Sequence, residues 1–486
     1  MNDRIQRLGL ILGVAFCLLL AALTRLQVVD ASKLQNDPRN TRGLTEAFSA
    51  ERGAIQTKDG KLLATSDPSG DEFKRQRRYP EGATYAPVTG YLSFTYGADG
   101  AERAFNDELT GGALPKGDDA LRQLFERKHA TRDVTLTIES KVQEVAVSAL
   151  GGRRGAVVAL DPTTGAVLAL ASAPSYDPNP LAAHSQDAVR NAYAALQGNT
   201  EHPLLPRPYR ESYPPGSTMK VVTSSAAFDH KPELTTKTYP TLSALDLPRS
   251  GGRQLHNFGN EKCGGQIADL LRVSCNTGFA AMGLDLGGDN MASEANAFGF
   301  NEKPPLDLPA TARSRFPSAD FFTRNEPGLA FSAIGQQDVS ATPLQMALVA
   351  AAIANGGVIM KPHLMDHTTD ARDNVVSTYK PSEWRTATSG ATAAVVKQMM
   401  IDVARRGTAT RAQIPGVTVA AKTGTAQTGR TPPTSHAWLI AFAPAEAPKV
   451  AVAVIIEDQA GAGENATGGR VAAPIAQQVM RAALGA

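Results

Sequence analysis

The sequence predicts an α+β protein in which one five-stranded antiparallel sheet, covered by helices, adjoins a helical lobe. Two groups of strand-like segments support this prediction: an early pair at 155–160 and 166–171, and a late trio at 418–425, 437–442 and 450–457. The chain between the two groups is helical and loop-rich, which favours a lobe inserted into the sheet. A chain of 486 residues is also too long for one core, so we expect further parts ahead of this domain.

The N-terminal segment predicts a membrane anchor. An uninterrupted apolar run over 8–23 follows Arg4 and Arg7. As a helix the run would be about 24 Å long, so flanking residues are needed to cross a hydrocarbon core of ~30 Å. No small-x-small cleavage site follows it, which favours a signal anchor over a cleaved signal peptide. We therefore expect a cytoplasmic tail at 1–7, a transmembrane anchor at 8–26, and the remaining chain outside the cell.

The segment 35–132 predicts a strand-rich, non-catalytic pedestal. Asp59-Gly60 is a preferred tight-turn pair between two strand-like stretches, which indicates a hairpin. Turn residues then recur at short intervals as far as Gly111-Gly112. Because this segment has few long apolar stretches, we expect no large core in it.

The elements of the larger domain, residues 133–486, follow from local patterns. An apolar stripe indicates a helix over 139–150, and a Pro- and Gly-containing turn joins the early pair of strands. A later helix begins after Thr342, an N-cap residue, with Pro343 in its first turn and Gly356 at its end. A terminal helix over 474–484 is expected to pack on the sheet.

One active site can be assembled from three short strings. The first is Ser217-Thr218-Met219-Lys220, where Ser217 begins a predicted helix and Lys220 lies one turn later on the same side. This geometry suits a serine nucleophile with a lysine base, and free amides at a helix start can hold negative charge. Burial, the helix end and a second ammonium at Lys422 would each lower the pKa of Lys220. The alternative is an N-cap serine with a surface lysine.

The other two strings supply a relay and a cationic dock. Ser274-Cys275-Asn276 interrupts two helical stretches, so a hydroxyl and an amide can project from the break, although such residues are common at helix junctions. Lys422-Thr423-Gly424 lies inside a predicted strand, where Gly is unfavourable unless a ligand or another backbone approaches closely. Lys422 with the hydroxyls of Thr423 and Thr425 would bind a carboxylate. The alternative is a glycine bulge beside a surface lysine.

Composition restricts the partners. A formal net charge of +2 argues against nucleic acid as the main partner. No Cys/His spacing resembles a zinc site. Cys263 and Cys275 lie in the exported part, where a disulfide can persist, and a pair of buried thiols is the open alternative.

Taken together and in this order, the three strings resemble the signature of the penicillin-recognising serine acyl-transferases. The whole chain is similar to the class B penicillin-binding proteins, and its Tyr79-Pro80 and 86–91 strings with a short pedestal look most like their compact PbpA-like branch of high-GC Gram-positive bacteria. Further strings that carry the resemblance are Glu51-Arg52-Gly53-Ala54-Ile55, Ile334-Gly335-Gln336-Gln337 and His436-Ala437-Trp438.

The resemblance implies a penicillin-binding/serine β-lactamase-like transpeptidase fold and a peptidoglycan D,D-transpeptidase. Ser217 would attack the penultimate D-alanine of a stem peptide with Lys220 as base, and Ser274 would pass a proton to the leaving D-alanine. Asn276 would hold the donor amide, and the backbone N–H groups of Ser217 and Thr425 would form the oxyanion hole. The Lys422-Thr423-Gly424 strand with Thr425 would bind the terminal carboxylate.

The resemblance also implies the partners and the location. Stem peptides ending in D-Ala-D-Ala and β-lactams would bind, without a metal or organic cofactor, and a SEDS-family glycan polymerase would be the membrane partner. The protein would be a single-pass protein of the cell membrane. A D,D-carboxypeptidase or β-lactamase-type hydrolase is the alternative, although the chain has no Glu-x-x-Leu-Asn string of class A lactamases. A β-lactam receptor or a scaffold is less well supported, because the cytoplasmic tail is short and a scaffold does not need all three strings.

Overall fold

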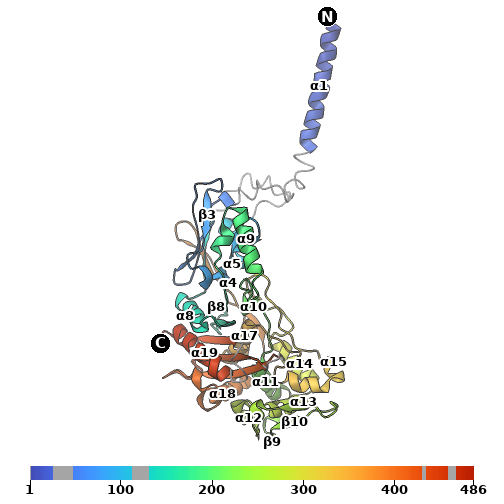
Figure 1. Cartoon of the computed structure of the whole chain (residues 1–486), viewed down its shortest axis with the longest axis vertical. Coiled ribbons are helices and arrows are strands. Elements are labelled where there is room, and N and C mark those ends of the chain that lie inside the picture. Colours follow the sequence, from blue (N-terminus) through green and yellow to red (C-terminus); the bar gives the residue numbers. More distant parts are fainter. Residues whose placement is uncertain (1, 26–47, 112–130, 429–433, 458–466) are drawn as a thin grey trace. The chain divides into compact units, whose positions relative to one another are not determined.

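The computed structural model describes residues 2–25, 48–111, 131–428, 434–457 and 467–486 (Figure 1). These residues form two compact units, Met1–Glu51 with Ser66–Gln76, and Arg52–Thr65 with Arg77–Ala486. The predicted positions 26, 35–47 and 112–130 lie outside the described residues.

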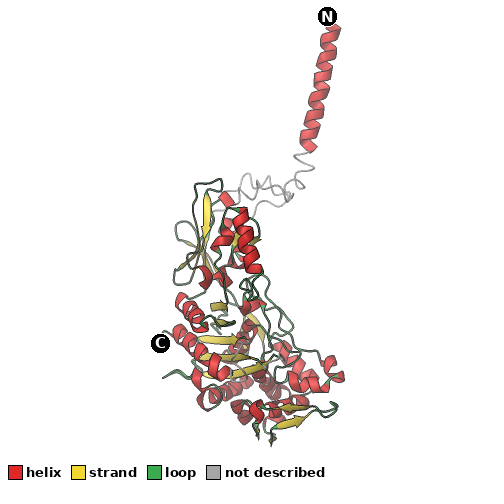
Figure 2. Cartoon of the chain, in the orientation of Figure 1, coloured by secondary structure: helices red, strands yellow, loops and turns green. Residues whose placement is uncertain are grey.

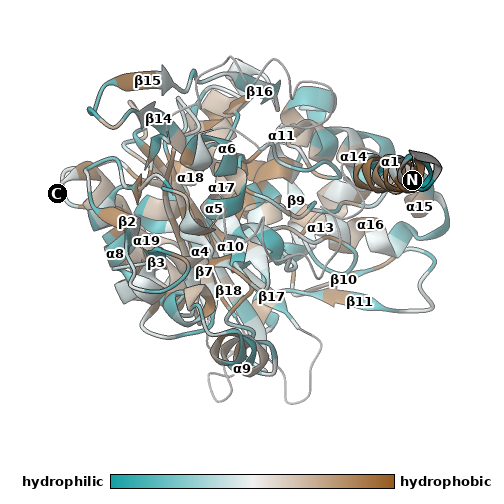
Figure 3. Ribbon diagram, turned by 90° about the horizontal axis from the view of Figure 1, so that it is seen from above, coloured by the Kyte–Doolittle hydropathy of each residue, from teal (hydrophilic) through white to brown (hydrophobic). Residues whose placement is uncertain are grey.

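The first unit contains the N-terminal helix α1 (Asn2–Thr24). Its stretch Gln6–Thr24 has the length and the composition needed to cross a membrane. The leucine side chains along it are exposed, and its ribbon is coloured mainly as hydrophobic in Figure 3. Exposed apolar side chains along a whole helix are typical of a segment that lies in lipid, which agrees with the predicted anchor.

The centre of the second unit is the predicted five-stranded sheet, in the order β17-β18-β19-β7-β8 with every neighbouring pair antiparallel. The early pair of strands therefore joins the late trio through the β19–β7 contact, as predicted. The strands are β17 (Ala420–Gln427), β18 (Ser435–Ala443), β19 (Val450–Ile456), β7 (Gly155–Leu160) and β8 (Val167–Ala173). Every residue of β7 and β19 is buried, because helices cover both faces of the sheet (Figure 2).

Two sets of helices supply that cover. Helices α19 (Gly468–Leu484) and α8 (Ser140–Leu150) contact each other and the sheet. Helix α17 (Pro343–Ala354) packs on β7, β18 and β19, and α18 (Gly390–Arg406) packs on β17. The Thr342 hydroxyl accepts the Gln345 N–H at 3.1 Å, so α17 has the predicted N-cap.

The start of α19 differs from the sequence prediction. The predicted helix began at Pro474, but α19 begins at Gly468 and contains Pro474. Packing decides the start, because a Cβ on Gly468 would come within 2.0 Å of the Trp438 carbonyl oxygen. A glycine lets the helix begin directly against β18, and the helix then continues through one residue that lacks an N–H donor.

The helical lobe lies between the early and late strands in sequence. It contains a 3-10 turn, η5 (Gly216–Met219), that leads into α11 (Lys220–His230), which contacts α13, α14 and α18. The other helices are α12 (Ile267–Val273), α13 (Asn276–Leu286), α14 (Gly288–Ala297), α15 (Ala319–Arg324) and α16 (Glu326–Ser332). The lobe also contains a hairpin of β10 (Ala244–Asp246) and β11 (Gln254–His256), and a second antiparallel pair of β9 (Tyr239–Leu242) and β12 (Cys263–Gly265) that flanks the hairpin in sequence.

A second sheet crosses the predicted boundary at residues 132 and 133. Its order is β15-β14-β6-β1-β2-β3. The strands are β1 (Ile55–Gln56), β2 (Leu62–Pro68), β3 (Arg75–Arg78), β6 (Asp133–Leu136), β14 (Met365–Thr369) and β15 (Val375–Thr378). Strands β1 and β2 form the predicted hairpin, whose Gly60 has φ +84°. Short helices α4 (Ala86–Thr89), α5 (Gly100–Ala104) and α6 (Asn106–Thr110) follow these strands.

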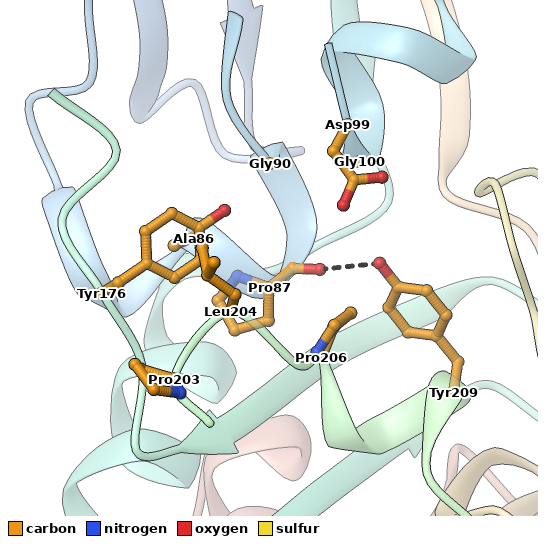
Figure 4. A pocket seen from close by; sticks show the side chains of 10 residues that line it. All are labelled: Ala86, Pro87, Gly90, Asp99, Gly100, Tyr176, Pro203, Leu204, Pro206 and Tyr209. Carbon is orange, nitrogen blue, oxygen red and sulfur yellow. Dashed lines mark hydrogen bonds between the residues drawn. The ribbon is translucent and has the colours of Figure 1, made fainter. Parts of the chain in front are cut away.

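Within the second unit, the segment around α4 packs against helix α10 (Arg207–Arg210) (Figure 4). The Tyr209 hydroxyl donates to the Pro87 carbonyl at 3.2 Å, and Arg210 forms two bonds of 2.7 and 2.5 Å with the Asp99 carboxylate. The cavity between them has a volume of about 10 Å³, close to the space of one water molecule. This contact fixes α10, which leads into the Ser217 turn.

Candidate active site

The Ser217 turn is held by its own rigid lead-in. Gly216 has φ +54°, and its amide donates to the Gly335 carbonyl at 2.8 Å. A Cβ on Gly216 would lie 2.8 Å from the Thr425 carbonyl oxygen, so the turn packs directly on the third string. Trp438 Nε1 donates to the Pro214 carbonyl at 3.0 Å and ties the same segment to β18. Ser217 is thereby placed at the sheet edge, half-buried, in the first turn before α11.

The two lysines meet at Ser274. Lys220 Nζ donates to the Ser274 carbonyl at 2.7 Å and to Asn276 Oδ1 at 2.8 Å, and it lies 3.3 Å from Ser274 Oγ. Lys422 Nζ donates to the same Ser274 Oγ at 2.8 Å. Both lysines are fully buried. The structure thus brings four predicted site residues from all three strings into one hydrogen-bonded cluster.

Burial changes the protonation of this cluster. Burial, and then the neighbouring Lys422 ammonium, hold the pKa of Lys220 well below its ordinary value. Burial lowers the pKa of Lys422 to about 7. A neutral amine has two N–H donors and one lone pair, and the two short bonds of Lys220 use both donors. The lone pair of such an amine then faces Ser274 Oγ at 3.3 Å and can accept a proton from a hydroxyl, as a general base must.

Ser217 itself is not bonded to that base. Within the part of the chain that the structure describes, the Ser217 hydroxyl makes no hydrogen bond. The predicted contact between Ser217 and Lys220 is therefore absent from this structure, although both residues lie at the predicted helix start. Catalytic hydrogen bonds commonly tighten only when substrate is bound.

The third string lies on β17, one of the two edge strands of the five-stranded sheet. A Cβ on Gly424 would come within 2.9 Å of the Pro215 carbonyl oxygen and 3.0 Å of Thr218, so only glycine fits between β17 and the Ser217 turn. The Thr423 hydroxyl shares a bond of 2.6 Å with Thr408, a residue outside the three strings. Thr425 is half-buried beside the Gly216 backbone.

The second string is shaped by a strained residue and a disulfide. Ser274 adopts a left-handed conformation, φ +60°, which costs a non-glycine residue about 1–2 kcal/mol. The next residue, Cys275, forms a disulfide with Cys263, so the disulfide alternative is the one present. Asn257 Oδ1 accepts the N–H groups of Asn276 and Thr277, both at 2.9 Å. These constraints fix the Ser274 carbonyl and the Asn276 amide where Lys220 meets them.

A buried network behind the turn was not predicted from the sequence. Glu457 accepts bonds from the Tyr213 hydroxyl at 2.7 Å and from Arg207 at 2.6 Å. The Tyr213 ring lies edge-on to Trp438 at 6.1 Å. These contacts join the lead-in of the Ser217 turn to the end of β19. Neither Glu457 nor Asn257 belongs to a recognisable string, so only their positions in the fold connect them with the site.

The comparisons with known proteins agree with this geometry. A family model described as the penicillin binding protein transpeptidase domain matches residues 155–481, and one described as the penicillin binding protein A dimerisation domain matches residues 52–131. The chain belongs to the penicillin-binding protein transpeptidases, and within them to the class B, PbpA-like members.

Particular relatives match over the full length. The peptidoglycan D,D-transpeptidase PbpA of Mycolicibacterium smegmatis is 41% identical over 100% of this chain and 99% of its own length. PbpA of Mycobacterium tuberculosis is 40% identical, again over 100% of this chain and 99% of its own length. The structure of penicillin-binding protein A from M. tuberculosis as a ceftriaxone acyl-enzyme complex has a TM-score of 0.81 and 38% identity, and covers 90% of this chain and 100% of that chain.

Proposed function

We propose that this protein is a peptidoglycan D,D-transpeptidase, which crosslinks stem peptides through a serine acyl-enzyme and releases D-alanine. The main support is the cluster at Ser274, where two buried lysines from different strings meet one hydroxyl beside the Ser217 turn. A structural role alone does not explain two fully buried lysines for which the described residues supply no carboxylate partner, because burying an unpaired charge is unfavourable. The arrangement suits an acyl-transfer site, because one amine can act as the base and the other can bind a carboxylate.

In the proposed mechanism, Ser217 Oγ attacks the carbonyl carbon of the penultimate D-alanine while the neutral Lys220 amine takes the serine proton. The backbone N–H groups of Ser217 and Thr425 hold the developing oxyanion, and the close packing of Gly216 on Thr425 supports their proximity. Removing one such donor typically costs ~2.7–4 kcal/mol.

The proton then reaches the leaving D-alanine through Ser274, whose hydroxyl lies between the two amines. An acceptor amine attacks the acyl-enzyme by the reverse route, which forms the crosslink and frees Ser217. β-Lactams take the place of the D-Ala-D-Ala end and acylate the same serine.

Substrate binding is assigned to the edge of β17. The donor peptide would lie beside this strand, with its terminal carboxylate near Lys422 and the hydroxyls of Thr423 and Thr425. Gly424 lets the Ser217 turn pack closely on β17, and Asn276 would hold the donor amide. The hydrogen bond between the Thr408 and Thr423 hydroxyls would have to break when the Thr423 hydroxyl binds the carboxylate.

The proposed setting is the outer face of the cell membrane. Helix α1 would be a single-pass anchor with a cytoplasmic N-terminus, and the catalytic domain, from residue 133 onward, would lie outside the cell. The expected membrane partner is a SEDS-family glycan polymerase, which makes the glycan strands that are then crosslinked. Arginines at positions 4 and 7 support this orientation.

Labelling with a fluorescent penicillin tests the proposal. The full-length protein in detergent should form a covalent adduct, and Ser217→Ala should abolish it. Ser225→Ala is the matched control, because Ser225 is a buried serine of α11 whose hydroxyl bonds only within its own helix, at 3.2 Å to the Val221 carbonyl. Labelling that survives Ser217→Ala would assign the nucleophile elsewhere.

Mass spectrometry of the products then distinguishes transfer from hydrolysis. Stem pentapeptides supplied with an acceptor strand should give crosslinked dimers and free D-alanine. Tetrapeptides without dimers would replace the proposed transpeptidase with a carboxypeptidase.

A further inference from the structure

A second hollow lies on the second unit, apart from the Ser274 cluster. It has a volume of about 820 Å³, within the range of ligand sites. Its polar and charged lining includes Lys303, Arg313 and Arg315, and Asp338 is the one carboxylate that the described part of the chain contributes to it. Its apolar lining includes Phe316 and Phe321.

The cationic side chains of this hollow are available to a ligand. Within the described residues, Lys303, Arg313 and Arg315 form no side-chain hydrogen bond or ion pair, and all three are exposed. The neighbouring carboxylate of Glu302 is engaged with Arg385. The chain as a whole carries a formal net charge of only +2, so three cations around one carboxylate are a local feature.

The hollow is connected to the Ser217 turn through backbone hydrogen bonds. Arg315 and Ser340 exchange bonds of 2.7 and 3.0 Å, and the next residue, Ala341, exchanges bonds of 3.0 and 2.8 Å with Tyr213. Ser212, which precedes Tyr213, also lines the hollow. The wall of the hollow and the lead-in of the nucleophile are therefore parts of one small ladder.

The lining selects the chemistry of the ligand. Arginine binds carboxylates through two parallel N–H donors, and Phe316 and Phe321 offer apolar area beside them. A peptide in which carboxylates alternate with small apolar groups would contact both the arginines and the phenylalanines of the lining. Stem peptides of peptidoglycan have this composition, and they are the substrate of the proposed function.

We propose that this hollow binds the free carboxylates of a stem peptide on the peptidoglycan strand being crosslinked. The inference rests on the proposed function and extends it with a second contact for the polymeric substrate. Lys220, Ser274, Asn276 and Lys422 do not line the hollow, so we expect a small β-lactam at Ser217 to bind without contacting it. We therefore expect the hollow to contribute to the binding of glycan strands and not to acylation by penicillin.

The test measures binding of soluble, uncrosslinked glycan strands with pentapeptide stems to the full-length Ser217→Ala protein, by fluorescence anisotropy. Two exposed ion pairs are worth about 0.2–1 kcal/mol each, so Arg313→Gln with Arg315→Gln should weaken binding about 2- to 30-fold. The difference should shrink as salt is added. Arg372→Gln with Lys380→Gln removes the same charge from exposed positions outside the hollow and should leave the affinity unchanged.

Two further measurements keep the inference refutable if the double variant is unstable. Asp338→Asn should strengthen binding, because it removes the one carboxylate of the lining. Strands whose stem carboxylates have been amidated should bind more weakly to the Ser217→Ala protein. Equal affinity for amidated and free strands, or equal weakening by the control pair, would refute the inference.

Penicillin labelling separates this inference from the proposed function. The Arg313 and Arg315 changes, made in the protein with Ser217 intact, should leave the acylation rate unchanged. If the unaltered protein fails to label, the proposed function fails. If the unaltered protein labels, but the Arg313 and Arg315 changes leave the affinity for glycan strands unchanged, only the inference about the hollow fails.

Discussion

The opposite protonation requirements of the two buried lysines predict a bell-shaped pH profile for acylation. Lys220 must be neutral to accept the serine proton, so the rate should rise with pH through the lowered pKa of Lys220. Lys422 must be charged to bind a carboxylate, so the rate should fall as pH rises above its pKa of about 7. Lys422→Arg should remove the falling limb, because a guanidinium stays charged throughout this range.

The size of the falling limb follows from the titration of one group. One pH unit above a pKa of about 7, about a tenth of Lys422 remains charged. The second-order rate constant for acylation should therefore fall about tenfold for each further pH unit, which corresponds to ~1.4 kcal/mol. A bound carboxylate stabilises the ammonium, so the limb should move to higher pH when the penicillin is saturating.

Stopped-flow acylation with a fluorescent penicillin, across about pH 5 to 10, measures both limbs. Thermal unfolding of each variant verifies that it is folded. Lys422→Ala serves as the second variant, and it should acylate slowly at every pH without a falling limb. A Lys422→Arg profile with the same falling limb as the unaltered protein would refute the assigned role of Lys422.

Two further changes test the supports of the site. Replacing Cys263 and Cys275 by alanine should lower the free energy of unfolding by about 3 kcal/mol, because the disulfide no longer closes a short loop in the unfolded chain. Denaturant titration measures this difference, and an unchanged midpoint would contradict it. Gly216→Ala should slow penicillin acylation, because its Cβ would press on the Thr425 carbonyl oxygen at 2.8 Å. Gly152→Ala is its control, since Gly152 also has positive φ, +74°, but open space around it, so that variant should lose some stability and keep the acylation rate.

Local patterns were sufficient to predict the sheet and the three strings. Apolar runs of strand length predicted all five central strands, and β7 has the predicted bounds, Gly155–Leu160. The Thr342 hydroxyl caps α17 as its sequence indicated. The three strings could be recognised because each carries its functional side chains within four residues. Their meeting at one site was expected because the first two strings were assigned to the helical lobe and the third to a late strand of the sheet.

Features that depend on distant contacts were not predictable in this way. Glu457 meets Tyr213 across 244 positions of sequence, and nothing near either residue indicates the other. Strands β14 and β15 join the sheet of β1 because of tertiary packing, so the domain boundary at residue 132 stays a prediction. The helix start at Gly468 likewise depends on its contact with Trp438.

The position of β17 at the outside of its sheet has a consequence beyond catalysis. An unpaired strand edge can pair with any extended chain, including another copy of the protein, and so invites aggregation. Here the turn around Pro215 and Thr218 packs at Gly424 beside the Trp438 side chain, so it covers a face of β17 and not its hydrogen-bonding edge. An extended segment of another chain would therefore compete with the substrate for the same backbone groups of β17, so occupation of this edge bears on solubility as well as on catalysis.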